Sequence, residues 1–221
     1  MKIGDCIEAV VKGIRSVIHN KRALAKALTL PLLVYLLMVV LPQLFQIPVL
    51  IQIFAGVISF FLYVYISVAT HRIIIMGSGA FSGFGLTMLG VREWQFLLAV
   101  FEVMFYCLPL FLLVYVPYVG VHVATVMAAY IVSRMSLIFP SIAIDAPMNA
   151  RASWQATSEY QLVMFTVVFV FACVFTLVEY GIFRIFKSSV LVDLFSVITI
   201  IFLVGALSEA YKTIMHEYAS R

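Results

Sequence analysis

The chain has 221 residues, of which 65% are hydrophobic and only 11% charged, and its formal net charge is +4. Soluble domains carry about 25% charged residues, so this composition excludes an ordinary water-soluble fold and indicates an integral membrane protein. We interpret the basic excess as charge retained on the cytoplasmic side of a membrane, and we expect no nucleic-acid partner because no nucleic-acid motif is present.

The first 22 residues have the pattern of an amphipathic helix. Apolar residues recur at helical spacing, and charged residues fill the positions between them. Because Lys21, Arg22 and Lys26 follow, we expect residues 1–22 to lie in the plane of the membrane, against anionic lipid on its inner surface. The alternative is a helix that packs under the bundle without touching lipid.

Six apolar stretches follow, each near the roughly 20 residues that cross the hydrocarbon of a bilayer. The first two come from one uncharged run, from Ala27 to Thr70, which Pro42 and Pro48 divide into two helices. The predicted fold class is all-α: a polytopic six-helix membrane bundle with an additional N-terminal amphipathic helix. The six spans form a single domain of residues 23–212, followed by a tail of residues 213–221. We expect these spans at about 27–42, 49–70, 94–115, 119–139, 160–182 and 189–210.

Basic residues are distributed unevenly between the two sides of this topology. Of the 14 Lys and Arg residues, eleven fall on the side of the N-terminal segment, two fall on the opposite side, and Arg134 lies within a span. By the positive-inside rule, we expect both termini in the cytoplasm.

Two charged residues lie inside adjacent spans. Glu102 lies roughly 12 Å into the third span and Arg134 roughly 8 Å into the fourth, at 1.5 Å per helical residue. A charge inside a bilayer is costly and needs a partner, so we predict an intramembrane ion pair between Glu102 and Arg134. Its role is either to hold the hairpin together or to form part of a relay or substrate site.

A second group of charges lies around the predicted outer turn between the fifth and sixth spans. Glu179, Arg184, Lys187 and Asp193 are expected to form an outer charge cluster at the membrane surface. The sequence has no paired metal-ligand motif and its three cysteines are isolated, so we predict neither a metal site nor a cofactor. Because no catalytic motif is present either, we expect a protein that is not an enzyme.

The stretch from residue 134 to residue 159 carries the densest set of polar and helix-breaking residues. Pro140 has no amide proton, which predicts that the fourth span ends or bends near Phe139. Asp145 is predicted to cap the N-terminus of a short surface helix at about 146–157. In that helix, Trp154 acts as an interfacial anchor.

We group the polar residues expected near the cytoplasmic surface as a candidate inner-face motif. Ser153 and Thr157 are four residues apart and share one helical face. Arg72 ends the second span, and together with Arg134 and Asp145 it can reach the same layer. The full candidate motif is His71, Arg72, Asp145, Ser153, Trp154 and Thr157.

The pattern R-x-S-L-x-F-P-x-I-A-x-D from Arg134, followed by S-W-x-A-T from Ser153, resembles part of a bacterial six-helix inner-membrane family. Its members are YciC-like proteins and the membrane domain of some glycerophosphodiester phosphodiesterases. The sequence Ala69-Thr70-His71-Arg72 is similar to an Ala-x-His-Arg motif of that family, and Arg92 matches as well. The resemblance implies a six-helix bundle in the bacterial inner membrane with both termini inside. It implies no reaction, because the phosphodiesterase activity belongs to a separate domain.

Two functional classes remain open from the sequence. The first is a non-enzymatic scaffold or accessory protein in envelope homeostasis, with membrane lipids as its partners. The second is a small transporter or channel with Glu102 and Arg134 in its pathway. We favour the first, because the polar residues lie in two layers with an apolar middle, whereas transport favours polar residues spread from one face to the other.

Overall fold

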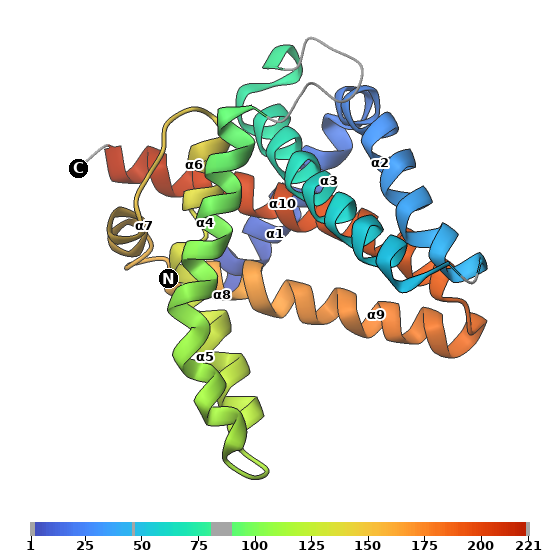
Figure 1. The fold of residues 1–221 in the computed structure, drawn as a ribbon. Helices are drawn as coiled ribbons and strands as arrows, with labels where there is room; N and C mark the ends of the chain where they lie inside the picture. The colour runs from blue at the N-terminus through green and yellow to red at the C-terminus, as the bar shows by residue number, and fades with distance from the viewer. Residues whose placement is uncertain (1–2, 46, 81–89, 220–221) are drawn as a thin grey trace.

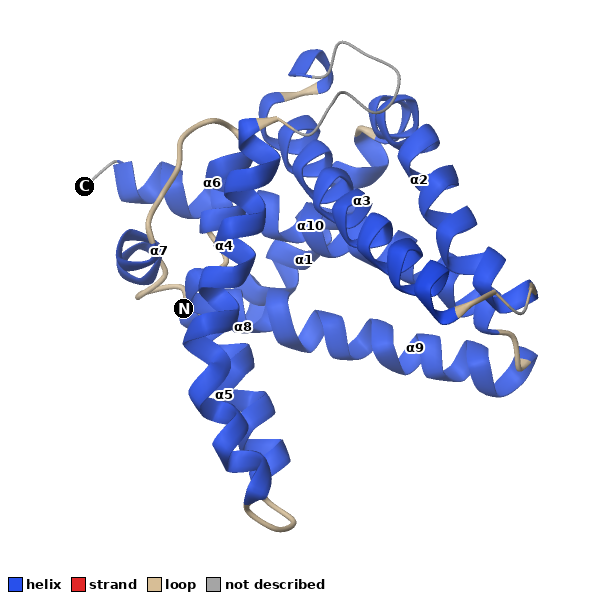
Figure 2. Cartoon of the chain, viewed as in Figure 1, coloured by secondary structure: helices blue, strands red, loops and turns tan. Residues whose placement is uncertain are grey.

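The computed structural model describes residues 3–45, 47–80 and 90–219, and within these residues it contains helices and no β-strand (Figure 2). The predicted all-α class is confirmed for these residues, and each of the six predicted spans overlaps a segment that is long and apolar enough to cross a membrane. These segments are Lys21–Pro42, Val49–Met76, Val91–Tyr115, Gly120–Ala143, Gln161–Phe186 and Ser189–Ala219.

The surfaces of these segments are those expected of a multi-pass membrane protein. In five of the six, no more than 28% of the most apolar window is buried, and side chains such as Phe105, Leu112 and Leu177 are at least 71% exposed. Soluble monomers rarely expose apolar surface of this extent. The segment Gly120–Ala143 differs, because 56% of its window is buried, and its buried residues lie mainly between Ser133 and Ala143.

The first hairpin consists of α2 (Lys21–Leu44) and α3 (Val49–Met76). α3 begins directly after Pro48, as the proline pair predicted. α2 begins earlier than residue 27, because the main-chain hydrogen bonds continue through the basic residues that precede the apolar run. α3 extends past residue 70 and ends at Gly77, whose φ of 90° is a conformation that other residues rarely adopt. The short 3-10 helix η1 (Ser78–Ala80) follows.

The second hairpin consists of α4 (Val91–Cys107) with the 3-10 segment η2 (Leu108–Tyr115), followed by α5 (Gly120–Met135). The change to 3-10 geometry coincides with Pro109, which cannot donate the next α-helical hydrogen bond. α5 starts in close contact with η2, since a Cβ atom at Gly120 would lie 1.8 Å from the carbonyl oxygen of Leu113.

The helix break associated with Pro140 comes earlier than predicted. α5 ends at Met135, and a separate short helix, α6 (Ile138–Ala143), contains Pro140 in its first turn. A proline is tolerated there because the first amides of a helix have no intrahelical acceptor. The carbonyl of Ser136, which Pro140 cannot satisfy, accepts instead from the amide of Phe139 at 3.3 Å.

The remaining chain forms α7 (Ala150–Ala156), α8 (Gln161–Phe165), the π-helical segment η3 (Thr166–Val170), α9 (Phe171–Phe186) and α10 (Ser189–Ala219). The predicted surface helix is present but shorter than 146–157, and the prediction that Asp145 caps it is wrong. The cap is Asn149, whose side-chain oxygen accepts from the amide of Ala152 at 2.8 Å. Asp145 is instead paired with two arginines, as described below.

The helices diverge from a shared core. In Figure 1 the hairpin of α4 and α5 extends toward the bottom of the view, whereas α9 and the adjoining ends of α2 and α3 extend to the right. Buried clusters around Met135, Ile138 and Met164 lie where the end of α3, the start of α4, α6 and the C-terminal part of α10 meet. We call this region the core end of the bundle. We call the turns that follow α2, η2 and α9 the hairpin end.

α1 (Ile3–His19) precedes α2 and packs against α10. The two helices approach closely, since a Cβ atom at Gly13 would lie 2.4 Å from the Cα atom of Ala206. Val17 is buried in this contact, whereas Ile7 and Ile18 remain more than half exposed. The segment is therefore a helix with one face packed on the bundle and apolar residues on another face that the protein does not cover.

Candidate functional site

Most of the polar side chains predicted for the inner face gather at the core end. We call this group the polar collar. It joins the end of α3, the start of α4, the end of α5, the loop after α6, and α7. Its members are Arg72, Arg92, Arg134, Asp145, Ser153, Trp154 and Thr157.

Asp145 connects two arginines from different helices. Its Oδ2 atom accepts from Arg72 Nη1 at 2.9 Å, and its Oδ1 atom accepts from Arg92 Nε at 2.8 Å. Arg92 adds a second bond through Nη2 at 2.9 Å, which makes the contact bidentate, and Arg72 also donates to the carbonyl of Ala143 at 2.7 Å. Asp145 has a positive φ of 62°, which aspartate tolerates better than most residues.

The electrostatic effect on Asp145 follows from this geometry. Its hydrogen bonds from the guanidinium of Arg92, and then from that of Arg72, hold the pKa of Asp145 below its ordinary value of 3.8, against an opposing effect of partial burial. The carboxylate is 54% exposed, so solvent screens much of this interaction. The pair of bridges ties the loop after α6 to two spans.

Arg92 was not among the predicted site residues, although it matched the family pattern. Its position directly before the third span placed it on the same side as Arg72, and this common side was the signal available in the sequence. The acceptor that brings the two arginines together, Asp145, is more than 50 residues away in the chain, and no local pattern indicates such a contact.

Arg134 is enclosed at the end of α5, with 3% of its surface exposed. Its Nη1 atom donates to the main-chain carbonyl of Thr157 at 2.8 Å, and its Nη2 atom donates to the carbonyl of Trp154. The guanidinium carbon lies 4.8 Å from the centre of the Trp154 ring, within the range of a cation–π contact. The charge is therefore held by main-chain dipoles and an aromatic face of α7.

The same junction satisfies the main chain of α5. The carbonyl of Arg134 lies in the last turn, where helical carbonyls have no intrahelical donor. It accepts from the hydroxyl of Ser153 at 2.9 Å. The hydroxyl of Thr157, whose shortest contact is the carbonyl oxygen of Ser153 at 2.8 Å, lies 3.2 Å from the carbonyl oxygen of Arg134. Ser153 and Thr157 thus lie on one face of α7, as their spacing predicted, and both are fully buried.

The predicted ion pair between Glu102 and Arg134 is wrong. Glu102 is exposed on α4, and no ion pair between the two residues exists in the described part of the chain. The prediction was based on the number of residues between each side chain and the end of its helix. That number indicates the depth of Glu102 and of Arg134 in the membrane, but not the direction in which either side chain points. The guanidinium of Arg134 turns toward α7, where two carbonyl oxygens accept its protons.

His71 is buried apart from the collar. Its Nδ1 atom lies 2.8 Å from the hydroxyl oxygen of Ser208 on α10. Ser208 also donates to the carbonyl of Val204 at 2.8 Å. Because a serine has one proton to donate, both contacts are satisfied when Nδ1–H donates to Ser208, and we assign this tautomer on that basis.

A cavity of about 280 Å³ adjoins His71 inside the bundle. Helices α3, α4, α5, α6, η3 and α10 contribute to its wall, which is apolar apart from a few hydroxyl groups and the imidazole. The lining residues are Tyr63, Ser67, His71, Phe96, Val100, Val132, Ser136, Phe139, Val167, Val168, Leu203, Val204 and Leu207.

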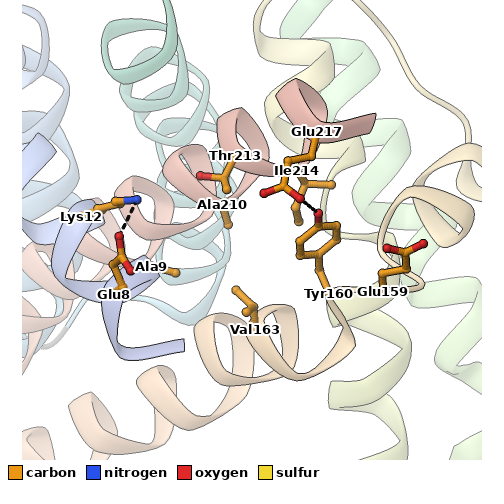
Figure 3. A pocket seen from close by; sticks show the side chains of 10 residues that line it. All are labelled: Glu8, Ala9, Lys12, Glu159, Tyr160, Val163, Ala210, Thr213, Ile214 and Glu217. Atoms are coloured by element: carbon orange, nitrogen blue, oxygen red, sulfur yellow. Dashed lines mark hydrogen bonds and ion pairs between the residues drawn. The ribbon is translucent and has the colours of Figure 1, made fainter. Parts of the chain in front are cut away.

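A more polar groove of about 500 Å³ lies between α1, the start of α8 and the last turns of α10 (Figure 3). Lys12 forms an ion pair with Glu8 at 2.8 Å, and the hydroxyl of Tyr160 donates to Glu217. Glu159 completes its charged lining. Throughout the described ranges, no group of three or more His, Cys, Asp or Glu residues is arranged to hold a metal ion.

The predicted outer charge cluster lies around the turn between α9 and α10, at the hairpin end. Lys187 ends α9 in a left-handed conformation, and Arg184 lies 6.0 Å from the ring of Tyr180. Glu179 and Arg184 form no ion pair with each other in the portion of the chain that the structure describes.

No family model matches the chain, and neither the curated proteins nor the solved structures contain a significant match.

Proposed function

We propose that this chain is an integral protein of a bacterial inner membrane that acts as a non-enzymatic scaffold or accessory protein in envelope homeostasis. The observation that carries the proposal is the internal use of the collar's charges. Asp145 is paired with Arg72 and Arg92, and the guanidinium of Arg134 is bonded to two carbonyls. Residues used in this way support a defined shape at one face of a membrane protein rather than a reaction.

The same contacts argue against transport through Glu102 and Arg134. A transport pathway needs polar groups that a solute can approach, yet Arg134 is 3% exposed and faces α7. Glu102 lines neither the cavity beside His71 nor the groove beside α1. We therefore retain the scaffold as the proposed role.

We also propose that the core end faces the cytoplasm and that α1 lies along the inner surface of the membrane. Arg15, Lys21 and Arg22 are exposed there, next to the exposed apolar residues Ile7 and Ile18. An amphipathic helix with this combination binds the surface of anionic bilayers. Anionic lipid is accordingly the first partner that we propose for the chain.

The membership in the YciC-like family remains part of this proposal. His71, Arg72, Arg92 and Arg134, on which the resemblance depends, all lie at the core end and make contacts between helices. A shared set of interhelical contacts is a physical reason for related chains to keep such residues.

The role can be tested by purifying the full chain from its native membrane in lipid nanodiscs and by reconstituting it in vesicles. If the chain is a scaffold, a protein partner should co-purify with it in a fixed ratio. The same amount of that partner should co-purify with the Glu102→Gln variant. In proteoliposomes, the chain should produce no solute flux above that of empty vesicles. Flux that disappears in Glu102→Gln while the variant stays folded would instead establish the transporter.

The lipid partner requires a separate comparison. The thermal midpoint of the protein should rise in phosphatidylglycerol nanodiscs relative to phosphatidylcholine nanodiscs. Replacing Arg15, Lys21 and Arg22 by glutamine should remove most of that rise. The matched control replaces Arg184 and Lys187 by glutamine at the hairpin end, where we expect the rise to persist. Equal effects of the two sets would contradict the proposed surface.

A further inference from the structure

The cavity beside His71 has features of a binding site that the scaffold role does not use. Residues of α3, η3 and α10 form much of its wall, and α4, α5 and α6 contribute the rest together with Ser136, which follows α5. In Figure 1 the α4–α5 hairpin separates from the other spans below the shared core. At about 30 Å³ per non-hydrogen group, a value based on the share of water in the liquid, 280 Å³ holds about nine such groups. A short length of hydrocarbon chain with one polar group is of this size.

Ser67 is one of the cavity's lining residues, and its hydroxyl has no hydrogen-bond partner within the described residues. The residue is 2% exposed, and its Oγ atom is buried and unpaired within the described residues. Several other hydroxyls in the spans bond to the carbonyl three or four residues earlier, as Ser133 does to Tyr130 and Thr70 does to Ile66, both at 2.7 Å. An unpaired buried hydroxyl destabilises a protein, and a ligand atom in the cavity would remove this cost.

His71 supplies a second polar atom on the same face of α3. It is four residues after Ser67, so the two side chains are neighbours on the helix. Because Nδ1–H is directed to Ser208, the other ring nitrogen, Nε2, is an acceptor. No hydrogen bond to Nε2 is found within the described residues. The imidazole is thus held in one orientation, it lines the cavity, and its second ring nitrogen is an acceptor.

The wall opposite α3 includes a π-helical turn. Val167 and Val168 belong to η3, and both line the cavity. Such turns are rare and occur frequently at functional sites, because they displace side chains from regular helical positions. A regular α-helix at this point would place these two valines differently around the cavity.

We propose that this cavity binds the polar end of an uncharged lipid alcohol, with its hydroxyl group between Ser67 and His71, the first part of its hydrocarbon chain against the apolar wall and the rest of the chain in the bilayer. The ligand hydroxyl donates to Nε2 of His71 and accepts from the hydroxyl of Ser67. A carboxylate or phosphate does not fit this site, because no cation lines it to offset the cost of burying a charge. An alkane fills the volume but leaves Ser67 unpaired.

The hydroxyl can come from a free long-chain alcohol, from diacylglycerol or from an isoprenoid alcohol. A diazirine-bearing hexadecanol tests the shared chemistry by photolabelling the full chain in nanodiscs. Hexadecane and hexadecanoic acid with the same diazirine are the matched probes. We expect the alcohol to label peptides of α3, η3 and α10 more strongly than either, and unlabelled diacylglycerol and polyprenol, added separately, to identify the natural source by competition.

Variants separate the polar contacts from the volume. Ser67→Ala should reduce labelling by the alcohol about threefold to tenfold, as expected for one hydrogen bond, while leaving the folded yield unchanged. Ser59→Ala is the control, because its hydroxyl is also buried and unpaired on α3 but lies outside the cavity. Val100→Phe should reduce labelling by all three probes, because it fills the space without removing a polar group.

The proposal is overturned if the alkane labels the same peptides as strongly as the alcohol, or if Ser67→Ala and Ser59→Ala behave alike. Stronger labelling by the fatty acid would also overturn it, since the cavity would then accept a charge. None of these outcomes depends on whether the protein acts as a scaffold.

Discussion

Arg134 and Thr157 are joined in both directions. The guanidinium of Arg134 donates to the main-chain carbonyl of Thr157 at 2.8 Å, and the hydroxyl of Thr157 lies 3.2 Å from the main-chain carbonyl oxygen of Arg134. Both residues are buried. This reciprocal contact fixes the short helix α7 against the end of α5, and the stability of the core end should depend on it.

The hydroxyls that satisfy the carbonyl of Arg134 should act as alternatives to each other. Thr157→Val should cost about 1 kcal/mol, because Ser153 still donates to that carbonyl. Ser153→Ala should cost a similar amount. The double variant should cost more than the sum, since the buried carbonyl then has neither donor. Thermal unfolding in one detergent measures all three, and strictly additive losses would contradict the shared acceptor.

Glu102 and Arg134 should prove independent in a double-mutant cycle. Glu102→Gln should change the unfolding free energy little, because the side chain is exposed. Arg134→Met should be strongly destabilising with or without that change. We expect the two effects to add within about 0.5 kcal/mol, as they do for residues that share no partner. A larger coupling energy would restore the ion pair that the sequence suggested.

The bridges at Asp145 should give a pH dependence at low pH. Because the pKa of Asp145 is lowered in the folded state by Arg92 and Arg72, its contribution is complete above 3.8, the ordinary value, and is lost as the pH falls through the lower folded value. Asp145→Asn keeps the size of the side chain and removes the charge. The wild-type advantage in thermal midpoint over this variant should therefore shrink between pH 5 and pH 2; an unchanged difference would contradict the bridges.

The contact between α1 and α10 should depend on Gly13. A Cβ atom there would meet the main chain of Ala206, so Gly13→Val should separate the helices and expose Cys6, which is 4% exposed in the intact protein. Labelling by a maleimide, in a background lacking Cys107 and Cys173, measures this. Gly181→Val is the control, because a Cβ atom added there would meet no neighbouring segment within 4 Å. Equal labelling in the two variants would contradict the close approach.

The sequence predicted what depends on composition and periodicity. The six spans follow from long apolar runs, and Pro48 marked the start of α3 correctly. Ser153 and Thr157 shared a face as expected because helical spacing is local information. Such features require no knowledge of which helices are neighbours.

The sequence failed where the partner is distant or belongs to the main chain. Asp145 has the composition of a helix cap, but two arginines from other helices compete for its carboxylate, and Asn149 caps α7 instead. The acceptors of Arg134 are carbonyl oxygens, which every residue carries and no motif reveals. The cavity beside His71 is similarly invisible, since it depends on how several helices converge.

The most direct test of the structural role of Arg134 is hydrogen exchange of the α7 amides. In the wild type, the segment Ala150–Ala156 should be protected, because Arg134 holds the last turn of α7 against α5. In Arg134→Met, we expect exchange in α7 to rise at least tenfold while α9 exchanges as before, since about 1.4 kcal/mol of lost local stability corresponds to that factor. Unchanged protection of α7 in a folded Arg134→Met variant would contradict the account.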